Sequence, residues 1–158
     1  MPTPTYRPLA TVTLGSSTSA VTFSSIPGTY RDLILVLDGT ASVGINGSVY
    51  FNSDTTAANY PYLRMTGNGS TASSNSGNNI WFDFQTSKSM AVIQIMDYSA
   101  TDKHKTSLSR WNNPASVIGA TAIRWTNTAA VTSLQVKDTN NSATFASGST
   151  FSLYGVIA

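Results

Sequence analysis

Side chains able to perform acid–base or nucleophilic chemistry are few and scattered in this sequence. His104 is the only histidine, cysteine and glutamate are absent, and all seven carboxylate side chains are aspartates. A Ser-His-Asp site would have to use His104, which lies between Lys103 and Lys105 and is expected to face solvent. Glycoside hydrolysis needs two carboxyl groups facing each other across a cleft, and the spacing of the aspartates indicates no such pair. We therefore predict that the protein is not an enzyme.

Metal and cofactor sites are also weakly indicated. Asp32, Asp38 and Asp138 stand at expected turn or strand-end positions, where a short carboxylate accepts local backbone hydrogen bonds. The segment NSDTTAAN at 52–59 is rich in oxygen ligands for calcium but lacks the D-x-D-x-D-G pattern. GNGS at 67–70 has neither the lysine nor the helix start of a phosphate-binding loop. We expect no metal ion and no cofactor.

The three tryptophans allow two interpretations. Trp81 and Trp125 lie in alternating segments, which favours a place in the core or in a subunit interface. With Trp111 and the seven tyrosines, they could instead form a flat platform for sugar rings. Glycan binding therefore stays open as an alternative.

The composition is typical of a β protein with few electrostatic partners. Charged residues make up 10% of the chain, against about 25% in an average globular domain. Serine and threonine together account for 45 of the 158 residues, while glutamate, a good helix former, is absent. The net charge of +2 comes without a basic cluster, so nucleic-acid binding is not expected. With no run of 18 apolar residues and no signal-peptide pattern, we expect a non-membrane protein made in the cytoplasm.

Hydrophobic periodicity predicts nine to eleven short strands. DLILVL at 32–37 is apolar on both faces and is predicted to be a central strand covered on both sides. The Gly, Ser and Asn stretch from Gly67 to Asn79 is predicted to be a mobile or partner-ordered loop. Many short strands without interleaved helices indicate an all-β, antiparallel β-sandwich of jelly-roll-like form. The expected strands are 9–14, 20–23, 32–37, 49–52, 63–66, 80–84, 90–98, 105–111, 121–126, 131–137 and 150–156.

The prolines at the start predict an extended N-terminal arm over residues 1–8, followed by one domain over residues 9–158. Proline fixes φ and removes a backbone donor, so this stretch is expected to lie outside any central sheet. We predict that the arm binds a partner. Its candidate partner-binding residues are Pro2, Pro4, Tyr6, Arg7 and Pro8.

Five segments in order resemble a widespread group of tailed-phage virion structural proteins. The resemblance runs from about Ser24 to Ala158, and the first ten residues lie outside it. It rests on IPGTYRDLILVLDG, VYFNSDTTAANY, LRMTGNGS, DYSATDKHKTSLSR and GSTFSLYGV.

This resemblance implies a β-sandwich subunit on the surface of a virus particle, with no catalytic residue. The first hypothesis is a capsid decoration or cement protein that binds the major capsid protein and stabilises the head. We expect it to be a homotrimer assembled in the host cytoplasm. The second is a tail or head fibre-associated module that binds host-surface glycans through tryptophan and tyrosine side chains. A hydrolase is disfavoured, because one histidine and scattered aspartates supply no acid–base pair.

Overall fold

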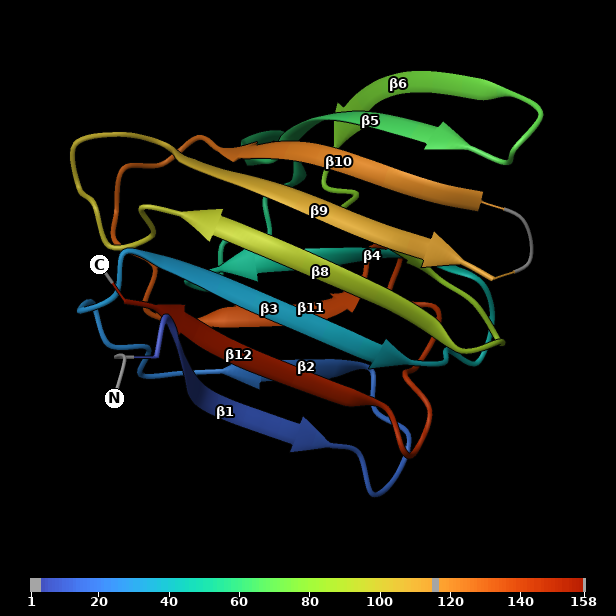
Figure 1. The fold of residues 1–158 in the computed structure, drawn as a ribbon, viewed down its shortest axis with the longest axis horizontal. Coiled ribbons are helices and arrows are strands. Elements are labelled where there is room, and N and C mark those ends of the chain that lie inside the picture. Colours follow the sequence, from blue (N-terminus) through green and yellow to red (C-terminus); the bar gives the residue numbers. More distant parts are fainter. Residues whose placement is uncertain (1–3, 115–116, 158) are drawn as a thin grey trace.

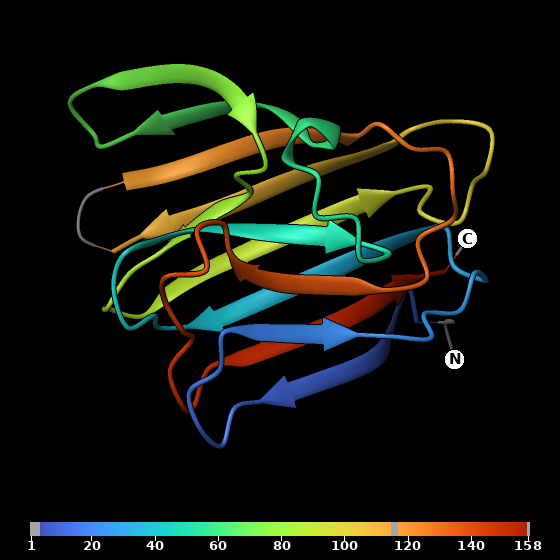
Figure 2. The ribbon, with the colours of Figure 1, turned by 180° about the vertical axis from the view of Figure 1, so that it is seen from behind.

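The chain folds into two antiparallel β-sheets packed face to face (Figures 1 and 2). The computed structural model describes residues 4–114 and 117–157. One sheet has eight strands and the other four, and the chain passes repeatedly from one to the other, as in a jelly roll. The predicted all-β sandwich is therefore confirmed.

Each strand is short and most are bounded by turn residues. In spatial order the large sheet contains β1 (Tyr6–Thr13), β12 (Thr150–Val156), β3 (Asp32–Gly39), β8 (Ser89–Met96), β9 (Lys105–Asn113), β10 (Val117–Trp125), β5 (Pro61–Gly67) and β6 (Ala72–Asn78). The small sheet contains β2 (Ala20–Phe23), β11 (Leu134–Asp138), β4 (Ile45–Phe51) and β7 (Phe82–Phe84). Helix in the described residues is limited to one 3-10 turn, η1 (Ala57–Asn59), so no helix there could cross a bilayer.

The core lies between the sheets and is built by period-2 alternation. Leu33, Leu35 and Leu37 point inward from β3 and are fully buried. Opposite them the small sheet contributes aromatic side chains, with Phe51 in edge contact with Trp81 and Trp125 at 5.4 Å between ring centroids. Each large apolar side chain buried in this way contributes about 1.5–3 kcal/mol. Packing of the two inner faces thus supplies most of the stabilisation.

The prediction that 32–37 is covered on both faces is only half right. Ile34 and Val36 point to the outer face of the large sheet and remain partly exposed. In the described ranges, no element of this chain packs over that face (Figure 1). The alternating leucines reflect burial, whereas the intervening Ile34 and Val36 form an apolar face that the chain itself leaves open.

The predicted loop from Gly67 to Asn79 is wrong over most of its length. Ala72–Asn78 forms β6, which pairs antiparallel with β5 along its whole length. Gly69, with φ of +88°, occupies the tight turn between them. Every side chain of β6 is exposed, so no hydrophobic alternation marks this strand in the sequence. Backbone pairing with β5 holds it in place.

Part of the predicted arm over residues 1–8 belongs to the large sheet. Tyr6, Arg7 and Pro8 belong to β1 and pair with Val156, Gly155 and Tyr154 of β12. A proline is tolerated there because β1 is an edge strand, and the register shifts directly after Pro8. Pro4 precedes the strand and is exposed, while Pro2 lies outside the described residues.

Gly47 on β4 is required by the close approach of Phe82 on the neighbouring strand β7. A Cβ atom at Gly47 would lie 2.1 Å from the Phe82 ring, which is fully buried and has little room to move. We predict that Gly47→Ala lowers the free energy of unfolding by about 1–3 kcal/mol. Gly15→Ala is the matched control, because nothing lies within 4 Å of its added Cβ. Urea titration of both variants measures the difference, and equal stabilities would contradict this account of the β4–β7 contact.

Candidate interaction surface

The residues considered for catalysis do not come together in the structure. His104 is exposed in the loop between β8 and β9, as expected from its lysine neighbours. Among residues 4–114 and 117–157, no three His, Asp, Glu or Cys side chains cluster as metal ligands would. Four aspartates form ion pairs with basic residues. These pairs are Arg31–Asp32 at 3.1 Å, Arg64–Asp83 at 2.7 Å, Lys88–Asp38 at 3.0 Å and Lys103–Asp97 at 3.0 Å.

The oxygen-rich segment 52–59 is occupied by structural hydrogen bonds. Asp54 accepts bonds from the Trp125 indole at 2.8 Å, the Asn59 amide at 2.8 Å and the Thr56 backbone N–H at 3.0 Å. Burial alone would raise the pKa of Asp54, but these bonds together lower it. Asn52 adopts φ of +50° and its side-chain oxygen accepts bonds from Thr132 and Ser133. The segment therefore ties β4 to the loop before β11.

Lys105 is a buried amine without a carboxylate partner at ion-pair distance. Its ammonium donates to the backbone carbonyls of Lys103 and Thr128, at 3.0 and 3.1 Å, and the residue is fully buried. Burial lowers its pKa. Both partners are main-chain carbonyls of neighbouring loops, so the position is explained by loop anchoring.

The tryptophans lie in the core, so the prediction of core burial is confirmed. Trp81, Trp111 and Trp125 are 0%, 4% and 1% exposed. An exposed tryptophan platform for sugar rings is therefore not formed, which corrects the basis of the glycan-binding alternative. Arg64 covers Trp111, with the guanidinium carbon 4.5 Å from the ring centroid. Its partner Asp83 lies on β7, so the cluster joins the two sheets at one end of the sandwich.

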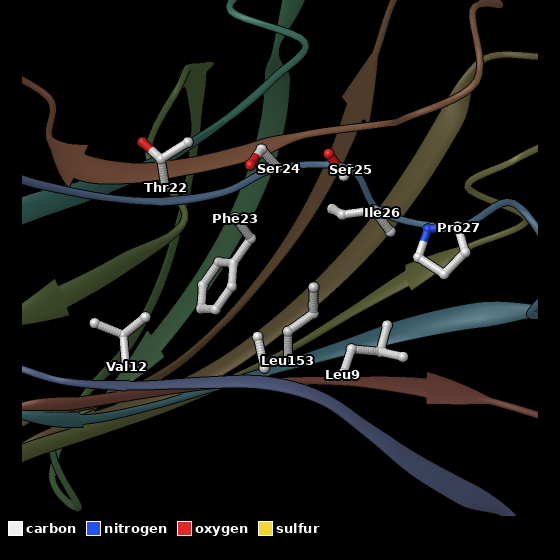
Figure 3. A pocket seen from close by; sticks show the side chains of 10 residues that line it. Leu9, Val12, Thr22, Phe23, Ser24, Ser25, Ile26, Pro27 and Leu153 are labelled. Atoms are coloured by element: carbon white, nitrogen blue, oxygen red, sulfur yellow. The ribbon is translucent and has the colours of Figure 1, made fainter.

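One apolar pocket opens at the opposite end, between β1 and β2 (Figure 3). Phe23 points into it from β2, while Leu9, Val12 and Leu153 approach from the large sheet (Figure 3). Its volume is about 410 Å³, and its lining includes no ionisable side chain. The pocket marks the end of the sandwich where the inner faces are incompletely packed together.

The feature that sequence reasoning missed is the outer face, defined as the side of the eight-stranded sheet turned away from the small sheet. Side chains that are neighbours in the strand register form rows across it, such as Ile34, Gln94, Leu108, Ala122 and Leu63. Most positions in these rows are apolar, and several large side chains are freely accessible. The most exposed are Ile118 at 69%, Met65 at 60%, Tyr6 at 58%, Leu63 at 56%, Met90 at 48% and Leu108 at 41%.

The predicted partner-binding residues border this surface only in part. Tyr6 is 58% exposed and lines a hollow of about 270 Å³ on the outer face together with Ile34, Val92 and Leu108. Arg7 and Pro8 are exposed at the β1 edge. The sequence signal for the outer face is that residues 32–37 are apolar at both sets of alternating positions. This signal predicted a strand covered on both sides within the chain.

Comparisons with known proteins give little further information. No protein-family model matches the chain, and no curated protein matches it. Among solved structures, the galectin LEC-6 of Caenorhabditis elegans is similar over 90% of this chain and 94% of its own length, at 7% sequence identity and a TM-score of 0.38. A likeness at this level carries no argument about function.

The Arg64–Asp83 pair makes the stability of the fold depend on pH. Burial raises the pKa of Asp83, while the Arg64 guanidinium opposes that shift. Above the ordinary pKa of 3.8 and up to the raised value, the folded state binds more proton at Asp83 than the unfolded chain. Stability therefore falls as the pH rises through this window. Without Arg64 the pKa rises further and the window widens.

We predict that Arg64→Met lowers the free energy of unfolding by about 3–5 kcal/mol at pH 8, because it leaves a buried carboxylate unpaired. The loss becomes smaller at pH 4, because the raised pKa of Asp83 leaves a larger share of its carboxyl groups protonated there. The double variant Arg64→Met/Asp83→Asn serves as control and recovers most of the stability at pH 8. Denaturant titrations at the two pH values measure this, and a loss independent of pH would contradict it.

Proposed function

We propose that the chain is a non-enzymatic structural subunit of a virus particle, most simply a capsid decoration or cement protein that binds the major capsid protein. The observation that carries the proposal is the exposed apolar outer face of the large sheet. Several large apolar side chains exposed on one face of a sheet are typical of a protein–protein contact site. The resemblance of five ordered segments to tailed-phage virion proteins supplies the particle context.

The chemistry of the outer face favours a partner that presents an apolar, closely fitting surface. Leu63, Met65, Leu108 and Ile118 are accessible there, together with the charged side chains of Arg110 and Arg124. Interface cores are depleted in charged residues and enriched in Met and Arg. A contact of this kind gains its free energy from burial of apolar area and needs no long-range charge attraction.

The ionisable side chains are not arranged for acid–base chemistry. The ionisable groups are engaged in ion pairs, backbone anchoring or solvent, as described for Asp83, Lys105 and His104. The apolar pocket between β1 and β2 contains no acid or base. General acid–base catalysis needs such a group within reach of a bound substrate. We therefore propose binding, repeated over many copies of a particle, as the whole activity, with avidity from symmetry.

The N-terminal residues contribute at the border of this contact. Tyr6 lies at the end of the outer-face hollow, and Arg7 is exposed beside it on β1. An aromatic side chain and an arginine are the residue types most often found among binding hot spots. We therefore propose that the predicted N-terminal arm, residues 1–8, contributes to the rim of the contact on the outer face. Trimer formation and the virion location remain predictions of the sequence.

Substitution on the outer face tests the proposal. We predict that Leu108→Asp and Ile118→Asp each lower binding to undecorated capsids at least tenfold, because a charge is desolvated in the contact. Both side chains are exposed in the free protein, so stability should change by about 0.5 kcal/mol or less. Thr22→Asp is the matched control, since Thr22 is exposed on the small sheet.

Co-sedimentation of purified variants with heads that lack this subunit measures the effect. Loss of binding in the outer-face variants, with the Thr22 variant and the thermal midpoints unchanged, supports the proposal. Binding by Leu108→Asp and Ile118→Asp equal to that of the unaltered protein would show that another surface is used. Absence of the unaltered protein from the pelleted heads would overturn the capsid assignment itself.

A further inference from the structure

The outer edge of β6 carries a row of backbone groups without a strand partner. Hydrogen bonds from Asn79 N–H to Tyr60 O at 2.8 Å and from Asn68 N–H to Thr71 O at 3.1 Å flank the β5–β6 hairpin. Hydrogen-bonded pairs alternate along an antiparallel ladder, so the pairs between these two bonds can be assigned. The pairs that bond toward β5 are Thr66/Ser73, Arg64/Asn75 and Tyr62/Gly77.

The remaining residues of β6 direct their backbone N–H and C=O groups away from β5. They are Ala72, Ser74, Ser76 and Asn78. In the described part of the chain, no strand pairs with that side of β6 (Figure 1). An edge of this kind is a template for pairing with another chain.

β6 differs from the other sheet edges of the described chain in lacking protection. The opposite edge of the large sheet, β1, contains Pro8 and a register shift. The edges of the small sheet are short, with four residues in β2 and three in β7. β6 has seven residues, no proline, no charge and no register shift against β5. Prolines, bulges, charges and short length are the devices that normally prevent edge-to-edge pairing.

The sequence of β6 is compatible with a second copy of itself as the partner, because Ser74 and Ser76 are identical residues on either side of Asn75 and no side chain of the strand is charged. If two copies pair antiparallel with Asn75 opposite Asn75, Ser74 faces Ser76 and Ala72 faces Asn78. All four outward residues then fall in hydrogen-bonded pairs, and Asn75 falls in the closer, non-bonded type. No like charges meet, and serine and asparagine side chains can bond across the seam.

We propose that two copies of the chain join through β6 about a two-fold axis, which makes one continuous sheet from two large sheets. Ser74 and Ser76 lie on the same side as Met65 and Leu63, so the outer faces of both copies become one apolar surface. This inference rests on the proposed assembly function and names a strand and a partner, with a two-fold pair in place of the homotrimer expected from the resemblance. The two are separable, because the pairing is tested with the protein alone and particle binding with capsids.

A cysteine at position 75 tests the register directly, because the natural chain contains none. Residues in a non-bonded antiparallel pair have Cα atoms about 4.5 Å apart, within the range of a disulfide. We predict that Asn75→Cys forms a covalent dimer on mild oxidation. Ser70→Cys, at the exposed hairpin turn, is the control, since its two copies would lie roughly 30 Å apart. Equal cross-linking of both variants would overturn the register.

Sedimentation equilibrium tests the association itself. We expect the unaltered protein to dimerise. Asn75→Asp should raise the dissociation constant of the dimer at least tenfold, because it places two carboxylates opposite each other. High salt should restore part of the affinity by screening this repulsion. Asn68→Asp makes the same charge change at the turn and keeps the bonds that its side-chain oxygen accepts from Ser70 and Thr71. A monomer at about 100 μM without cross-linking of Asn75→Cys, or a dimer unaffected by Asn75→Asp, would refute the pairing.

Discussion

The unequal width of the two sheets is the constraint on which the rest of the structure depends. Four strands cannot cover the inner face of eight, so the ends of the large sheet need other solutions (Figure 2). At one end, Trp111 and the Arg64–Asp83 pair fill the space beneath β5 and β10. At the other end, the sheets leave an apolar pocket between β1 and β2.

The outer side of the large sheet is governed by the same imbalance. β3 and β8 are apolar at both alternating sets of positions, a pattern normally found where a sheet is covered on both sides. This chain supplies one cover only. The exposed apolar residues of this face are therefore the ones on which the proposed contact with another subunit rests. The unprotected β6 edge adds a second direction in which the same sheet can be extended.

Hydrophobic periodicity predicted the fold class, and each strand expected from it overlaps a strand of the structure. This works because a strand that buries one face shows period 2. It failed for β6, whose exposed serines and asparagines bury nothing and whose existence depends on pairing with β5. The Arg64–Asp83 contact was equally hidden, since these residues meet only after β5 and β7 are brought together. Tyr6–Pro8 were expected in an arm outside the sheet, but they pair with β12, which is distant in the sequence.

The pairing of β1 with β12 also sets the order of events during synthesis. Among the described strands, β1 has no neighbour in its sheet other than β12, and β3 likewise borders β12. Tyr6–Thr13 therefore has no strand partner during synthesis until Thr150–Val156 has been made. Pairings between residues so distant in sequence form slowly, since a long loop must close first. Thr150–Val156, which lies between β1 and β3, is consequently the strand that completes the large sheet.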